Sequence, residues 1–96
     1  MTEINETSVI SLATNASFQS LGEGAVILMI NSGQLYTCNE STEAFLKNID
    51  GKRSFGAILD ILVSEFSADR ETLSQDFYVV AGDLRQNGII EIQSGS

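Results

Sequence analysis

Residues 25–51 read AVILMINSGQLYTCNESTEAFLKNIDG. At Asn39 the period at which apolar residues recur changes from two, which is typical of strands, to about 3.6, which is typical of helices. Before this point, the branched apolar run 25–30 is typical of a strand covered on both faces, and after a turn the segment 34–38 predicts a returning strand. Beyond it, apolar residues recur at helical spacing as far as the Asp-Gly pair at 50–51, which ends the helix. Asn39 is a suitable N-cap for that helix because its side-chain oxygen can accept from a first-turn amide.

The sequence before this stretch adds a further strand. Residues 17–21 alternate between polar and apolar side chains, and the Gly-Glu-Gly sequence that follows predicts a turn into the run at 25–30. These segments together form a small antiparallel meander of three strands. The short apolar patch 9–12 could pair as an edge strand.

Helical spacing continues downstream. Apolar residues recur over 55–66, where Ser54 is the expected N-cap, and again from Leu73 to Leu84, where either Asp69 or Ser67 could be the cap. Gly88 ends this last helix, and residues 89–92 could return as a short strand or pack as an apolar tail. We therefore predict an α+β, winged-helix-like fold in which an N-terminal three-stranded antiparallel meander is followed by three helices.

The length and composition limit what the chain can be. At 96 residues with 43% hydrophobic and 19% charged residues, it predicts one folded domain over 9–93 after a flexible tail at 1–8. Five basic and 13 acidic residues give a net charge of −8, which disfavours nucleic-acid and anionic membrane surfaces. With neither a signal peptide nor a run long enough to span a bilayer, we expect a cytoplasmic protein.

The residue types also argue against catalysis. The sequence has no histidine and a single cysteine, so a Cys/His zinc site, a Ser-His-Asp triad and an internal disulfide lack their parts. The paired carboxylates Glu40 and Glu43, and likewise Asp76 and Asp83, are expected to serve solvation of helix surfaces. Cys38 is expected to be a small buried hydrophobic residue. We therefore expect no enzyme activity, no metal and no cofactor.

Taken in order, several motifs resemble the PqqD family. The segment Gly33 to Asn39 is similar to its Gly-x-hydrophobic-Tyr-x-Leu-Asn stretch, and Ile49-Asp50-Gly51 is similar to the signature that closes its first helix. Further matches are Lys52-Arg53-Ser54-Phe55 through Ile58, Phe66, Asp76-Phe77, Leu84 and Gly88-Ile89-Ile90, so that the resemblance runs from about residue 24 to 92. Two departures are Cys38, where the family usually has Leu, and the lack of a proline near the start.

The resemblance implies a non-catalytic protein of ribosomal peptide biosynthesis, as in pyrroloquinoline quinone and lasso-peptide pathways. Such a protein recognises the leader segment of a precursor peptide by strand addition and presents the precursor to a modifying enzyme of radical SAM, protease or cyclase type. The peptide would lie between the edge of the strand 34–38 and the third helix. The residues expected to bind it are Gln34, Leu35, Tyr36, Thr37, Cys38, Asp76, Val79, Val80, Asp83 and Leu84.

Other functions fit the same architecture. A subunit that docks or stabilises a larger biosynthetic enzyme is the main alternative. A winged-helix DNA-binding protein is less favoured, because its third helix would need Arg, Lys, Asn or Gln for the major groove. Residues 70–87 instead carry more acidic than basic residues.

Overall fold

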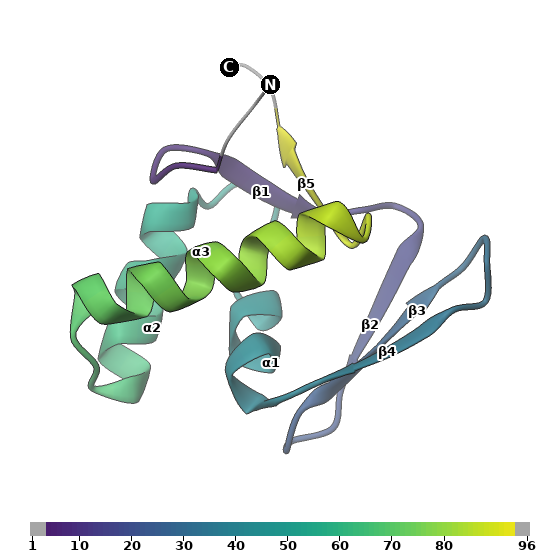
Figure 1. Cartoon of the computed structure of the whole chain (residues 1–96), viewed down its shortest axis with the longest axis horizontal. Coiled ribbons are helices and arrows are strands. Elements are labelled where there is room, and N and C mark those ends of the chain that lie inside the picture. Colours follow the sequence, from purple (N-terminus) through teal and green to yellow (C-terminus); the bar gives the residue numbers. More distant parts are fainter. Residues whose placement is uncertain (1–3, 94–96) are drawn as a thin grey trace.

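The computed structural model describes residues 4–93 (Figure 1). The chain runs through four strands, three helices and a last strand within this range: β1 (Val9–Leu12), β2 (Ala16–Ser20), β3 (Ala25–Met29), β4 (Leu35–Cys38), α1 (Glu40–Lys47), α2 (Phe55–Phe66), α3 (Arg70–Gln86) and β5 (Ile90–Gln93). Strands β2, β3 and β4 form an antiparallel sheet in that order, and β1 pairs with β5 in a separate two-stranded sheet. The predicted α+β fold, a three-stranded meander followed by three helices, is confirmed.

The ends of the helices follow the expected local chemistry. Asn39 Oδ1 accepts from the Thr42 amide at 3.0 Å, and Ser54 Oγ accepts from the Ala57 amide at 3.1 Å. Asp69 caps α3, which settles the choice between Asp69 and Ser67. Ser67 instead ends α2 in the left-handed conformation, with φ 52°. Each cap satisfies a backbone amide that has no partner within its own helix.

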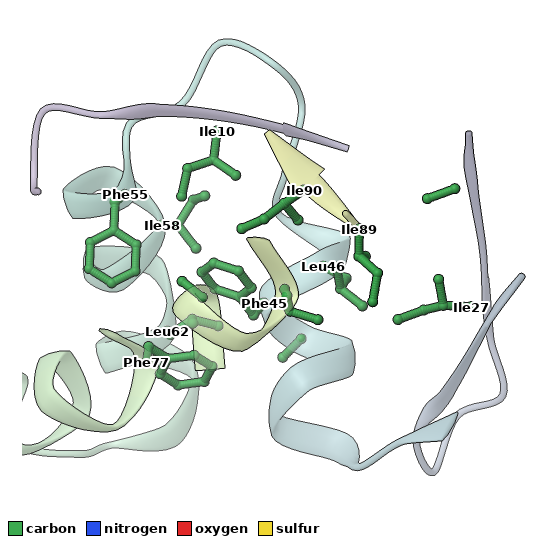
Figure 2. Packing of buried hydrophobic residues seen from close by; sticks show 14 of the residues in the cluster. Ile10, Ile27, Phe45, Leu46, Phe55, Ile58, Leu62, Phe77, Ile89 and Ile90 are labelled. Atoms are coloured by element: carbon green, nitrogen blue, oxygen red, sulfur yellow. The ribbon is translucent and has the colours of Figure 1, made fainter. Parts of the chain in front are cut away.

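Helix α1 lies at the centre of the core. The ring of Phe45 stacks on Phe77 of α3 with centroids 5.4 Å apart and meets Phe55 of α2 edge-on at 6.2 Å. From the sheet side, Ile27 of β3 points toward Leu46 of α1 (Figure 2). In Figure 1 α2 lies to the left of α1 and the sheet of β2, β3 and β4 to its right. One short helix therefore joins the helical half of the molecule to the sheet.

The sheet is covered on one face only, so the prediction that β3 is buried on both faces was wrong. Ile27 and Met29 are buried, whereas Val26 is half-buried and Leu28 is 39% exposed. The strand therefore alternates in the way expected of an antiparallel sheet with one face in the solvent. A continuous apolar run conceals this alternation, because the outward positions carry the same residue types as the inward ones.

Residues 4–8, the described part of the expected tail, contact the helices. The Phe55 amide donates to the Ser8 carbonyl at 2.7 Å, and the Arg70 guanidinium donates to both carboxylate oxygens of Glu6 at 3.1 and 2.8 Å. Arg70 also donates to Asp60 at 2.8 Å. These hydrogen bonds, first of all the one to Glu6, raise the pKa of Arg70, and the bond from Arg70 lowers the pKa of Glu6. The boundary between tail and domain stays a prediction.

No helix in residues 4–93 has the length and apolar character needed to cross a membrane.

Candidate functional site

Strand β4 offers an open backbone edge. Among the strands of residues 4–93 it pairs only with β3, in the antiparallel register Ala25–Cys38, Val26–Thr37, Ile27–Tyr36 and Leu28–Leu35. The other side of the strand carries no sheet partner within this range. An edge of this kind can accept a further strand.

The direction of the backbone groups in β4 follows from the bonds around β3. The Met29 amide donates to the Gln34 carbonyl at 2.8 Å, and on the other side of β3 the Leu21 amide donates to the Gly24 carbonyl at 2.8 Å. In an antiparallel pair, hydrogen-bonded and non-hydrogen-bonded positions alternate. Odd-numbered residues of β3 therefore form the hydrogen bonds to β4. Because Tyr36 and Cys38 are paired with Ile27 and Ala25, their backbone N–H and C=O groups point toward β3. The N–H and C=O groups of Leu35 and Thr37 consequently point to the open edge.

The side chains of β4 alternate between the two faces of the sheet. Tyr36 and Cys38 lie opposite the buried residues Ile27 and Ala25, and both are half-buried against the core. Leu35 and Thr37 lie on the uncovered face, where Leu35 is 62% exposed. Cys38 is thus a half-buried residue at the rim of the core, whose Sγ lies 3.5 Å from the Ala25 carbonyl. Burial raises the pKa of its thiol, which keeps it in the protonated form.

Helix α3 presents a stripe of the predicted residues along one flank. Asp76, Val80 and Asp83 are spaced i, i+4 and i+7, so they lie on the same side of the helix. Tyr78 lies on the other flank and contacts Phe55 of α2, with ring centroids 4.8 Å apart. The flank of α3 that carries Asp76, Val80 and Asp83, called here the acidic stripe, therefore faces away from α2.

The predicted residues differ in how they relate to the core. Tyr36 and Cys38 of β4 and Val80 of α3 are each half-buried against the hydrophobic core. Leu84 is only 7% exposed and belongs to the core itself, whereas Val79 is 66% exposed on the outer surface of α3. Gln34 is exposed just before β4, and its carbonyl accepts a hydrogen bond from the Met29 amide.

The prediction that Glu43 is a solvated residue on the helix surface was wrong. It is 5% exposed, and its carboxylate accepts hydrogen bonds from the Ser20 hydroxyl and from the Gly22 and Gly24 amides, each amide at 3.2 Å. The partners lie 19–23 positions earlier in the chain, so no local pattern indicates the contact. Glu40, one turn earlier on α1, is exposed as expected.

The family model described as coenzyme PQQ synthesis protein D (PqqD) matches residues 24–90. A protein named PqqA binding protein, from Gluconobacter oxydans (strain 621H), is 38% identical over 45 residues, which are 47% of this chain and 47% of that protein. The chain thus spans about half the length of the curated relative that it matches.

A similar solved structure is TbiB1 in complex with the TbiA(beta) leader peptide. It superposes with a TM-score of 0.78 over 88% of this chain and 99% of that chain, at 15% sequence identity. At this level of identity the likeness establishes the fold. The region matched by the family model begins just before β3 and ends at the start of β5, so it contains both β4 and α3.

Proposed function

This chain belongs to the PqqD family, and from that membership we infer that it is a non-catalytic protein that binds the leader segment of a ribosomally made precursor peptide. The resemblance seen in the sequence over residues 24–92 is thereby confirmed at the level of the family. The names of the two similar proteins support the inference, since one is called a PqqA binding protein and the other was solved with a leader peptide. We expect the protein to act in the cytoplasm, where precursor peptides are made.

The observation that carries the proposal is the open edge of β4. Leu35 and Thr37 present their N–H and C=O groups outward, so an extended peptide can pair with them antiparallel to β4. Each such main-chain hydrogen bond contributes about 0.5–1.5 kcal/mol and is tolerant of the peptide's sequence. Selectivity would come from alternate side chains of the peptide.

The second wall of the proposed site is the flank of α3 that carries Asp76, Val80 and Asp83. Peptide side chains opposite Tyr36 would lie on the inner face of β4, and we expect them to reach this flank of α3, where Val80 offers an apolar contact. The carboxylates of Asp76 and Asp83 are exposed and would favour a basic residue nearby. Gln34, Leu35, Thr37, Cys38 and Val79 would border the site, and Leu84 would support it from within the core.

Binding can be tested by calorimetry with two defined probes. One is a synthetic peptide covering the amino-terminal half of any short precursor found encoded beside the gene for this chain, and the other is the PqqA peptide of Gluconobacter oxydans. We expect saturable binding of at least one probe with a Kd of roughly micromolar or tighter, and none with a scrambled peptide of the same composition. Lack of binding by both probes would contradict the proposal.

The docking or stabilising subunit remains the alternative function. It predicts that a precursor peptide binds only after the modifying enzyme has been added, whereas strand addition to β4 needs no enzyme. Repeating the calorimetry with and without a purified candidate modifying enzyme separates the two. We expect that enzyme to be of radical SAM, protease or cyclase type.

A further inference from the structure

Glu43 is a buried charged group that the proposed peptide site does not use. Among residues 4–93 it is the only charged residue that is buried. Its Oε2 accepts from the Ser20 hydroxyl and the Gly22 amide, and its Oε1 accepts from the Gly24 amide. Burying a carboxylate is costly unless its oxygens receive hydrogen bonds, so this side chain and the turn at 20–24 stabilise each other.

The turn held by Glu43 rests directly on the end of β4. Gly24 has φ +131°, and a Cβ at this position would lie 2.4 Å from the Cys38 carbonyl oxygen. The backbone of the turn can approach Cys38 this closely only because residue 24 is glycine. The next residue, Ala25, begins β3 and is paired with Cys38. A displacement of the turn would therefore move the last residues of the open edge.

Helix α1 also holds the other wall of the proposed site. Phe45 lies two positions after Glu43, on the opposite side of the helix, and stacks on Phe77 of α3 at 5.4 Å. One side of α1 thus binds the turn through a carboxylate, and the other side binds α3 through an aromatic contact. These two contacts connect the edge of β4 to α3 through a single rigid element.

We propose that Glu43 is a positioning residue for peptide binding, which fixes the edge of β4 relative to α3 through the turn at 20–24. This inference rests on the proposed function, since the peptide would have to contact both walls at once. When the walls of a site are already fixed, less conformational entropy is lost as the peptide binds, so the affinity is higher. Glu43 itself would not contact the peptide.

The central variant is Glu43→Gln, which keeps the size of the side chain and removes one acceptor. Its amide nitrogen cannot accept, so either the Gly22 or the Gly24 N–H loses its partner. Glu40→Gln is the matched control, because Glu40 lies in the same first turn of α1 and is exposed. Ser20→Ala is a milder second variant that removes only the hydroxyl donor and guards against loss of folding.

Amide hydrogen exchange and affinity for the precursor peptide are measured on all variants. For Glu43→Gln we expect exchange at Gly22, Gly24 and Cys38 to rise about tenfold, with α2 and α3 unchanged, and peptide affinity to fall about threefold or more. Ser20→Ala should also raise exchange in the turn and lower peptide affinity, but by smaller factors. Glu40→Gln should change neither exchange nor affinity.

Two results would overturn the inference alone. One is exchange that rises equally in α2 and α3, which would make Glu43 a general stabiliser of the fold. The other is a loosened turn with peptide affinity equal to that of the unaltered chain. Absence of peptide binding by the unaltered chain would overturn the proposed function and this inference with it.

Discussion

Thr37 and Tyr36 are neighbours in β4 whose backbone groups point in opposite directions. The amide of Tyr36 faces β3, and that of Thr37 faces the open edge. Proline removes the backbone donor, so its effect depends on the position at which it is placed. We expect Thr37→Pro to fold and to bind the precursor peptide about fivefold or more weakly, because about 1 kcal/mol of main-chain bonding is lost.

Tyr36→Pro is the matched control for this substitution. It should break the pairing with Ile27 and lower the midpoint of thermal unfolding, which circular dichroism measures. If Thr37→Pro bound the peptide as well as the unaltered chain, the β4 edge would not be the binding surface.

Leu35 provides a second test at the same scale. Its side chain is 62% exposed on the uncovered face, where a paired peptide would place one of its own residues directly beside it. We expect Leu35→Ser to change the free energy of unfolding by less than about 0.5 kcal/mol, as is usual for exposed positions. A lost cross-strand contact of roughly 0.2–1 kcal/mol should weaken peptide binding by up to about fivefold in calorimetry. Unchanged affinity would place the peptide elsewhere.

Local chemistry was predictable at single residues, and long-range contacts were not. Asn39 and Ser54 act as N-caps because capping depends on an amide three positions away. Glu43 depends on partners in a turn some twenty positions earlier, which only the fold brings close. Its burial therefore could not be predicted from the sequence.

At the scale of elements, the flank of α3 can be tested without altering the strand. Asp83 is exposed on the stripe with Asp76 and Val80, so Asp83→Lys reverses a charge that would face the peptide. We expect the affinity for a precursor peptide with basic residues to fall about threefold or more, with the larger effect at low salt. Calorimetry at two salt concentrations measures the affinity and its dependence on salt.

Gln75→Lys is the control on the other flank of α3. Gln75 lines a hollow of about 380 Å³ together with Tyr78 and Arg70, away from the acidic stripe. It adds the same cationic side chain to the same helix and should leave affinity nearly unchanged. Asp83→Lys changes the net charge by +2 and Gln75→Lys by +1. A loss of binding free energy with Gln75→Lys that is about half the loss with Asp83→Lys would therefore indicate a general effect of net charge and remove α3 from the site.

The type and order of the elements were predictable because the hydrophobic period changes sharply at Asn39. The faces of β3 were not, because Val26 and Leu28 are as apolar as the buried residues beside them. Which residues of β3 are buried is decided by the packing of the helices against one face of the sheet, and this is a property of the tertiary structure. In the same way, Leu84 matches the helical pattern equally well as a core residue or as part of the proposed site.

At the scale of the whole molecule, charge separates the peptide-binding function from DNA binding. The net charge is −8, and Arg70 of α3 is already hydrogen-bonded to Glu6 and Asp60. We expect no saturable binding to duplex DNA by fluorescence anisotropy at moderate salt. Tight binding that weakens steeply as salt is raised would contradict this expectation and favour the winged-helix DNA-binding alternative.

The measurement that tests the central claim most directly is an NMR titration of the isotopically labelled chain with the precursor peptide, followed at each amide. Strand addition predicts shifts at residues 34–38 and along 76–85, with slower exchange of the Leu35 and Thr37 amides as they gain partners. Shifts centred on Lys52 and Arg53, or no shifts at all, would contradict a peptide site between β4 and α3.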